Sequence, residues 1–233
     1  MNICFLDSKV SKEELSKLYK EDLNIVLIPT SPYLYDAINS HPDIQVNILS
    51  GSSFIIAKNS SLDITNEIFN NIDIKFSDKL LKNKYPENIF LNAINLKDYF
   101  IHNLKYTDKN LLSAVNNKTL INIKQGYSKC SCAIVSDNAL ITSDIGIYNT
   151  LKPYTDIDVL LIPSGDITLL DLPYGFIGGA CGLISKNKIA FFGDLKYHTY
   201  GNDILNFLSK YDVEPIYLSD SKLIDKGSIL TML

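Results

Sequence analysis

The chain has 233 residues, of which 46% are hydrophobic and 21% are charged, and its formal net charge at pH 7 is −4. This composition is that of an ordinary globular protein, and it excludes a disordered chain, a collagen and a coiled coil. All 22 basic residues are lysine. Because arginine supplies the planar group that grips phosphate and guanine in a bidentate way, its absence argues against nucleic-acid binding.

Short apolar runs, alternating runs and helical patterns follow one another in a repeating order. In the first half they predict a strand at 2–6, a helix at 13–19, a strand at 24–28, a helix at 33–39, a hairpin at 45–49 and 54–57, a strand at 72–76 and a hairpin at 89–93 and 99–102. In the second half they predict a helix at 110–115, a strand at 120–123, a hairpin at 130–135 and 139–142, a helix at 145–151, a strand at 159–162, a hairpin at 176–184 and 189–192, a helix at 203–209 and a strand at 214–218.

The spacing of these elements predicts a repeat of roughly 45 residues that occurs five times. A fifth hairpin begins at 227–230 and is left incomplete, while the strand at 2–6 has no hairpin of its own. Pairing between these two segments would remove an exposed sheet edge. We therefore predict one α/β domain over residues 1–233, a five-unit αβ propeller of pseudo-five-fold ββαβ repeats closed by the N-terminal strand.

This architecture and three short stretches resemble the pentein fold, and more narrowly an uncharacterised clostridial family assigned to it. The stretches are KQGYSKCS at 124–131, GFIGGACG at 175–182 and DKGSI at 225–229. The resemblance implies kinship with guanidino-group modifying enzymes and with a non-enzymatic ribosomal anti-association factor. Such enzymes place a nucleophilic cysteine near the C-terminus, a histidine in a middle unit and carboxylates on the guanidinium. This chain departs from the pattern, because no cysteine follows Asp225.

Two cysteines are candidate nucleophiles. Cys181 lies in a glycine-rich strand, where Gly178 and Gly179 are costly unless a ligand or a neighbouring strand approaches the backbone closely. Cys130 begins another predicted strand, and the residues that precede it closely enough to curl towards it are Lys124 and Tyr127. The alternative for both thiols is a structural role, since free cysteine is among the residue types most often buried.

Histidine supplies the candidate general base. His198 follows the fourth hairpin in a loop at a strand end, where it would form an oriented acid–base pair with Asp194; the alternative is a solvated loop histidine. His41 is expected at the C-terminus of a helix, and His102 is expected on the surface.

Four aspartates flank hairpins in different units, namely Asp43, Asp144, Asp194 and Asp225. In a closed ring these positions would converge at one end of the axis, where carboxylates in a semi-buried channel favour a guanidinium or an amine. The alternative is turn and helix-cap chemistry, for which aspartate is equally suited.

The sequence contains no phosphate-binding loop, no zinc-ligand spacing and no apolar run long enough to span a membrane. We therefore expect no cofactor, metal, nucleic acid or membrane partner, and four reduced cysteines favour the cytoplasm. The favoured function is non-catalytic binding of a small cationic guanidino or amine ligand, or of a protein partner, at the ring axis. The alternative is a cysteine-dependent hydrolase or amidinotransferase that acts on a guanidino or amidine group. In it Cys181 or Cys130 attacks, His198 moves the proton, and Asp144 and Asp194 hold the cation.

Overall fold

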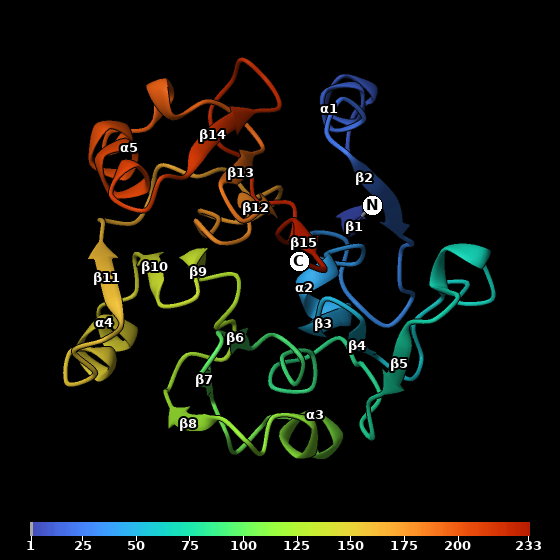
Figure 1. Cartoon of the computed structure of the whole chain (residues 1–233). Coiled ribbons are helices and arrows are strands. Elements are labelled where there is room, and N and C mark those ends of the chain that lie inside the picture. Colours follow the sequence, from blue (N-terminus) through green and yellow to red (C-terminus); the bar gives the residue numbers. More distant parts are fainter. Residues whose placement is uncertain (1) are drawn as a thin grey trace.

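The computed structural model describes residues 2–233, and this part of the chain forms five three-stranded sheets arranged around a common centre (Figure 1). Written from the innermost strand outwards, the sheets are β15 (Leu230–Thr231), β1 (Asn2–Asp7) and β2 (Leu23–Ile28); β3 (Val46–Ser50), β4 (Ser53–Ile56) and β5 (Asp73–Phe76); β6 (Ile94–Asn95), β7 (Tyr99–His102) and β8 (Thr119–Asn122); β9 (Cys132–Ser136), β10 (Ala139–Thr142) and β11 (Asp158–Leu161); and β12 (Cys181–Ser185), β13 (Lys188–Phe191) and β14 (Glu214–Tyr217).

Each sheet has the same topology. The inner strand pairs antiparallel with the middle strand, and the outer strand pairs parallel with it. A parallel pair requires a crossover connection. Helices or helical turns lie in these crossovers, on the periphery of the molecule (Figure 1): α1 (Lys12–Leu18), η1 (Glu67–Phe69), α3 (Lys109–Ala114), α4 (Ile145–Leu151), and η2 (Leu195–Tyr197) with α5 (Gly201–Ser209). A further short helix, α2 (Pro42–Gln45), precedes β3 near the centre.

Polar side chains fix the first turns of these short helices. Ser11 and Glu14 form a reciprocal capping box on α1, while the carboxylates of Asp108 and Asp144 accept backbone N–H groups at the starts of α3 and α4. Helices of only one or two turns are not stable alone, so such caps and the packing behind them decide where the helices form.

Within the described residues the hydrophobic core consists of five clusters, and each lies between two neighbouring sheets. Phe5 of β1 and Phe54 of β4, for example, meet edge to face with ring centroids 5.0 Å apart. Leu6 of β1 shares a cluster with Ala190 of β13, so the first sheet also packs against the last one. Burial of apolar surface therefore joins sheet to sheet.

The two ends of the described chain meet in one sheet. β1 pairs antiparallel with β15, in the register Cys4 to Thr231 and Phe5 to Leu230, and parallel with β2. The N-terminal strand thus supplies the partner that the last hairpin lacks, as the sequence pattern predicts.

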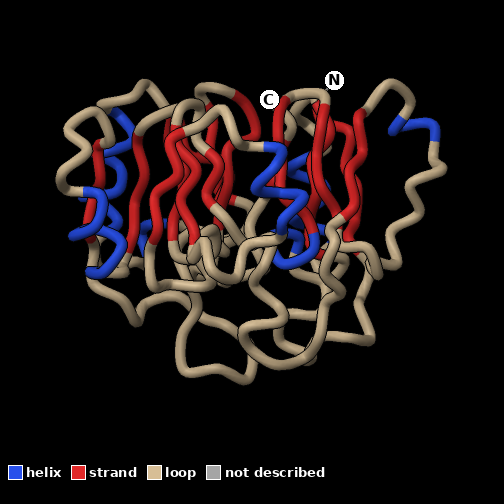
Figure 2. Tube along the Cα trace, turned by 90° about the horizontal axis from the view of Figure 1, so that it is seen from below, coloured by secondary structure: helices blue, strands red, loops and turns tan. Residues whose placement is uncertain are grey.

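The strands run between two different ends of the molecule (Figure 2). One end carries the hairpin turns and both chain termini, and the other carries the long segments that lead into the inner strands. We call these the hairpin face and the loop face. The loop-face segments comprise residues 29–45, 77–93, 123–131, 162–180 and 218–229.

Several predicted elements have different bounds in the structure. Residues 89–93 are irregular instead of a strand, because Phe90 and Leu91 are buried between sheets and Asn92 bonds to other loops. Residues 33–39 form turns closed by Ser31 and Tyr35 carbonyls instead of a helix. The strand expected at 176–184 begins only at residue 181.

His102 is completely buried, which corrects its expected place on the surface. None of the helices in residues 2–233 has the length and apolar character that crossing a bilayer requires.

Candidate functional site

A cavity of about 280 Å³ opens at the loop face, and segments that precede four different inner strands line it. Its polar lining consists of Tyr35, His41, Tyr127, Cys130 and Asp225. Its apolar lining consists of Ile38, Ile44, Leu169, Leu172, Pro173, Tyr174 and Phe176. The cavity therefore combines a thiol, an imidazole, a carboxylate and the phenols of three tyrosines with aliphatic and aromatic wall residues.

Cys130 is held by side chains from two other loops. Its thiol donates to Asp43 Oδ2 at 3.1 Å and accepts from Asn92 Nδ2 at 3.1 Å. Asn92 Oδ1 in turn accepts the backbone N–H groups of Lys129 and Cys130, and its Nδ2 also donates to the Asp43 carbonyl. This single amide fixes both the position of the thiol and its distance from the carboxylate.

The surroundings of Cys130 keep its thiol protonated. Burial raises its pKa well above the ordinary value, and the negative charges of Asp43 and Asp225 raise it further. A thiolate is the nucleophilic form of cysteine. In the protein without a ligand, Cys130 is therefore a neutral thiol that donates to a carboxylate.

Asp43 lies at the centre of a buried polar network, with 1% of its surface exposed. The Ser228 hydroxyl lies 2.5 Å from Asp43 Oδ2 and 2.6 Å from the Gly178 carbonyl, and it accepts from the Lys129 ammonium at 3.1 Å. The second carboxylate oxygen, Asp43 Oδ1, has no hydrogen-bond partner within the described residues. A buried acceptor without a partner is costly, so this oxygen adds an unsatisfied negative charge directly behind the Cys130 thiol.

His41 lies between two buried carboxylates. Its Nε2 is 3.9 Å from Asp7 Oδ2, and its Nδ1 is 4.0 Å from Asp225 Oδ1. Asp225 is also held by backbone N–H groups of Phe176 and Gly227. Burial raises the pKa of Asp225, while the nearby His41 opposes that increase. The imidazole is therefore oriented by acids on both sides, at the wall of the cavity that Cys130 also lines.

The glycine-rich stretch allows chains to approach one another at this centre. A Cβ at Gly179 would lie 2.0 Å from Asp225 Oδ1, and one at Gly178 would lie 2.2 Å from the Cys132 carbonyl oxygen. Gly227 has a φ of +71°, and a Cβ there would lie 2.2 Å from the Cβ of His41. Of the two explanations for these glycines, the structure shows close approach by neighbouring segments.

The other cysteines lie in packed surroundings. Cys181 belongs to the core cluster between the β9–β11 sheet and the β12–β14 sheet, donates to the Ile177 carbonyl at 3.2 Å, and has a pKa that burial raises to about 12. Cys4 and Cys132 are also completely buried, with pKa values that burial raises to about 12. None of these three thiols lines the loop-face cavity.

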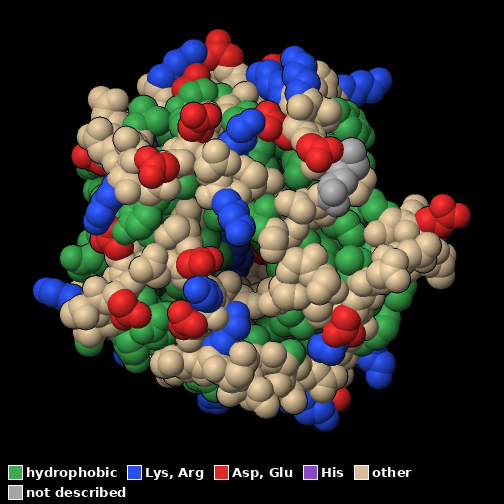
Figure 3. Space-filling view, in the orientation of Figure 1, with side chains coloured by type: hydrophobic (Ala, Val, Ile, Leu, Met, Phe, Trp, Pro, Cys, Tyr) green, Lys and Arg blue, Asp and Glu red, His purple; other side chains and the backbone are tan. Residues whose placement is uncertain are grey.

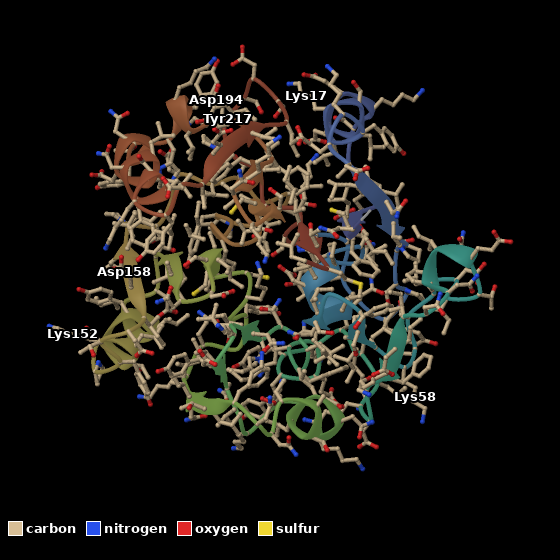
Figure 4. All side chains as sticks on the ribbon, in the orientation of Figure 1. Lys17, Lys58, Lys152, Asp158, Asp194 and Tyr217 are labelled. Atoms are coloured by element: carbon tan, nitrogen blue, oxygen red, sulfur yellow. The ribbon has the colours of Figure 1, made fainter. Side chains whose placement is uncertain are left out.

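Other predicted site residues lie elsewhere. Asp194 caps η2 and lies at the outer edge of the molecule beside Tyr217 (Figure 4), and Asp144 caps α4. His198 is influenced by the charge of Asp166 instead of forming the expected pair with Asp194: that charge opposes the decrease in the pKa of His198 that burial causes, and the His198 Nδ1 accepts from the Tyr200 backbone. Lys124 is exposed. The expected convergence of four aspartates thus holds for Asp43 and Asp225, and cap chemistry explains the other two.

Several residues of the site were not among the sequence candidates, namely His41 as a central group, Tyr35, Asn92 and Ser228. The dipeptide His41-Pro42 looked like a helix end, whereas His41 immediately precedes α2 and turns inward. Ser228 carries a clear local signal, because it follows a glycine in a segment that already contained a candidate aspartate. Asn92 carries none, since its role depends on contacts with residues 38 positions away.

Across residues 2–233, no group of three or more histidine, cysteine, aspartate or glutamate side chains is arranged to hold a metal ion.

A family model described as a family of unknown function, DUF6873, matches residues 5–230. The chain belongs to this family. No curated protein matches the chain in sequence.

Solved structures with the same fold include enzymes. The amidinotransferase SxtG from Microseira wollei, of the saxitoxin biosynthetic pathway, superposes with a TM-score of 0.57 and 9% identity over 97% of this chain and 89% of its own. Agmatine deiminase from C. jejuni, solved with substrate bound, superposes with a TM-score of 0.56 and 12% identity over 98% of this chain and 92% of its own. DDAH from Pseudomonas aeruginosa, as a cysteine-to-serine mutant complexed with citrulline, superposes with a TM-score of 0.54 and 12% identity over 94% of this chain and 92% of its own. These likenesses show that the chain has the pentein-like α/β fold of guanidino-modifying enzymes.

Proposed function

We propose that the protein binds a small guanidino or amidino cation in the loop-face cavity and that Cys130 attacks the central carbon of this group. The observation that carries the proposal is that a thiol, an imidazole and the Asp225 carboxylate line one cavity, while a second buried carboxylate, Asp43, contacts the thiol from behind the cavity wall. The structural neighbours support the same chemistry at the level of the fold, since they are an amidinotransferase, a deiminase and a hydrolase of dimethylarginine.

The cavity suits a small cation. Its volume of about 280 Å³ lies just below the range of drug-sized ligand pockets, about 300–1,000 Å³, and so suits a small ligand. Asp225 is a carboxylate of the cavity wall that would pair with a planar cation, and the charge of Asp43 lies one side chain behind it, on the Cys130 thiol. The rings of Tyr35 and Tyr127 offer faces that attract a cation.

A bound cation would also activate the thiol. The carboxylates of Asp43 and Asp225 raise the pKa of Cys130, and a cation bound in the cavity beside Asp225 and the thiol would oppose that effect. The thiolate therefore becomes accessible mainly in the complex, where the group that it attacks is already in place.

The chemical steps then follow in order. The Cys130 thiol passes its proton to His41, its sulfur forms a bond to the guanidino carbon, and the C–N bond to the leaving amine breaks as His41 returns the proton to that nitrogen. Water next adds to the same carbon with its proton accepted by His41, and the C–S bond breaks to give a ureido product and the free thiol. An amine in place of water would give amidine transfer.

A second candidate function is binding without chemistry. The observation that favours it is the hydrogen bond from Cys130 to Asp43, in which the thiol is protonated and acts as a donor. In that case the same cavity holds the cation and Cys130 only completes its wall. Both candidates share the finer description of the fold as a propeller closed by the N-terminal strand, which the β1–β15 pairing supports.

The test uses agmatine, arginine and methylated arginines with the full chain. Calorimetry measures binding, and release of ammonia or methylamine measures turnover. We expect Cys130→Ser to abolish turnover while retaining binding, and Cys132→Ser, a matched buried thiol, to retain both. We expect Asp225→Asn to weaken binding by at least about tenfold, the loss of one charge-assisted contact. Saturable binding without turnover would favour the second candidate, and no binding of any of these cations would reject both.

A further inference from the structure

The hairpin face carries a second and larger cavity, of about 480 Å³, which extends along the centre of the molecule between the inner strands. Its wall includes β3 residues from Val46 to Ser50, and also Ile134, Leu183 and Ile229 from three other units. Figure 3 looks onto this face and shows the hollow in its middle, with lysine side chains in and around it. We call this hollow the axial cavity.

Lys129 lines the axial cavity and has an unusual environment for a lysine. Only 7% of its surface is exposed, and its ammonium donates to the Gly178 carbonyl at 3.3 Å and to the Ser228 hydroxyl at 3.1 Å. Within the described residues no carboxylate lies within 4.0 Å of it. An ammonium has three donors, so one is left for a ligand. A buried cation without an opposite charge in contact is costly, and an anion would remove that cost.

Two further lysines line the same cavity. Lys118 is half-buried and is held in place by Asn95 Oδ1 at 2.6 Å and by the Leu96 carbonyl at 2.7 Å. Lys97 is exposed at the rim, and Asp137 is the only carboxylate side chain among the described lining residues. The side chains that line the axial cavity thus carry an excess of positive charge in a protein whose net charge is −4.

We propose that the axial cavity binds a small organic anion, a carboxylate or a phosphate monoester with an apolar body, whose acid group pairs with Lys129. The apolar body would contact Ile134, Leu183 and Ile229. The volume of about 480 Å³ lies within the range of ligand pockets, about 300–1,000 Å³. Asn47, which also lines the cavity, has a buried Oδ1 without a hydrogen-bond partner, so a hydroxyl or amino group on the ligand would have an acceptor.

This site is distinct from the loop-face cavity in both position and charge. The loop-face cavity presents carboxylates and is proposed to take a cation, whereas the axial cavity presents ammonium groups. The two are separated by the chain of contacts from Lys129 through Ser228 to Asp43. Anion binding is measured without any guanidino compound, so its outcome is independent of the function proposed above.

The probes are benzoate and phenyl phosphate, with benzylamine as a cation of the same shape, in titration calorimetry at a fixed chloride concentration. We expect saturable binding of at least one of the two anions below about 10 mM and none of benzylamine. Whichever anion binds more tightly identifies the acid group. Lys129→Met keeps an unbranched side chain only one atom shorter and removes the charge, and we expect it to weaken binding by at least about tenfold.

Lys152→Met is the matched control, since Lys152 lies at the outer edge of the molecule (Figure 4), and we expect it to leave the affinity unchanged. Lys118→Met provides a second test that does not touch the Ser228 network, with an expected loss of several-fold. The proposal is wrong if neither anion shows saturable binding, if benzylamine binds equally well, or if both cavity variants bind as tightly as the Lys152 variant.

Discussion

His102 shows how strongly the position of one side chain sets its chemistry. It is completely buried at the end of β7, with Nδ1 2.7 Å from Thr107 Oγ1 and Nε2 3.0 Å from the Gly126 carbonyl. Burial lowers its pKa from 6.5 to about 4. The imidazole is therefore neutral at pH 7. Through its two ring nitrogens it links the end of β7 both to Thr107 and to Gly126, in the segment that leads to Cys130.

The pKa of His102 predicts how stability depends on pH. Below pH 6.5 the unfolded chain binds a proton on this residue, whereas the folded protein does so only near pH 4. Stability should therefore fall as the pH falls from 6.5 to 4, by up to about 3 kcal/mol from this group. Urea unfolding at pH 7, 5.5 and 4.5 measures the slope. We expect His102→Gln to be less stable at pH 7 and to show a flatter slope; an unchanged slope would exclude His102 as the source.

Cys130 and Asp43 give a second prediction at this scale. Because the Asp43 charge contributes to the raised pKa of Cys130, Asp43→Asn should lower that pKa. The pH at which iodoacetamide labels Cys130 should then shift downwards. Peptide mapping after labelling between pH 7 and 10 measures the shift. Cys132 is the internal control, since burial dominates its pKa of about 12 and its labelling should not change. Equal acceleration of both thiols would indicate general loosening of the fold instead.

Among the elements, α1 is joined to the site by a buried ion pair. Lys226, next to Asp225, donates to Glu14 Oε1 at 2.8 Å and Oε2 at 2.7 Å. Glu14 also accepts from the Ser11 backbone in the capping box of α1. One carboxylate therefore fixes the start of a helix and the segment that carries Asp225.

Loss of this carboxylate should be costly. Glu14→Gln leaves Lys226 without its partner, and since the Lys226 side chain is only 17% exposed, we expect a loss of about 2–4 kcal/mol in the free energy of unfolding. Glu13→Gln is the control on the same helix, because Glu13 is 65% exposed and pairs with Lys17 at the surface. We expect that control to change stability by less than about 0.5 kcal/mol. Chemical denaturation measures the free energy of unfolding of both variants. Similar losses in the two would mean that the buried pair of Glu14 and Lys226 contributes little to stability.

Elements with strong local signals were predictable from the sequence. Helix α4 has the predicted bounds, 145–151, because Asp144 caps it and an apolar stripe follows. The conformations of residues 33–39 and 89–93 could not be predicted from the sequence, because burial and contacts with distant loops override their local patterns. The site divides in the same way. Cys130, Asp43, Asp225 and Tyr127 were candidates that lie together, but which histidine turns inward depends on how the loops fold over the centre.

At the scale of the whole molecule, two cavities of opposite charge lie along one axis. Lys129 and Cys130 are adjacent in sequence, yet Lys129 lines the axial cavity and Cys130 the loop-face cavity. The Lys129–Ser228–Asp43 contacts form the polar layer between them. In this layer the Lys129 ammonium and the Asp43 carboxylate both contact the Ser228 hydroxyl. A charged ligand in either cavity would therefore change the electrostatic surroundings of the other cavity.

The pairing of β1 with β15 brings the two ends of the described chain into one sheet, and a covalent link can test it. Cys4 and Thr231 are register partners in this antiparallel pair, and facing residues in such pairs lie within the Cα separations that a disulfide spans. We expect Thr231→Cys to form a disulfide with Cys4 on oxidation, seen as a loss of two free thiols in the intact protein. The link should raise the free energy of unfolding by about 2–4 kcal/mol over the reduced form. Thr231→Ser, which gains no thiol, should respond to neither oxidation nor reduction. Failure of the disulfide to form in the folded protein would mean that the two terminal strands do not pair as described.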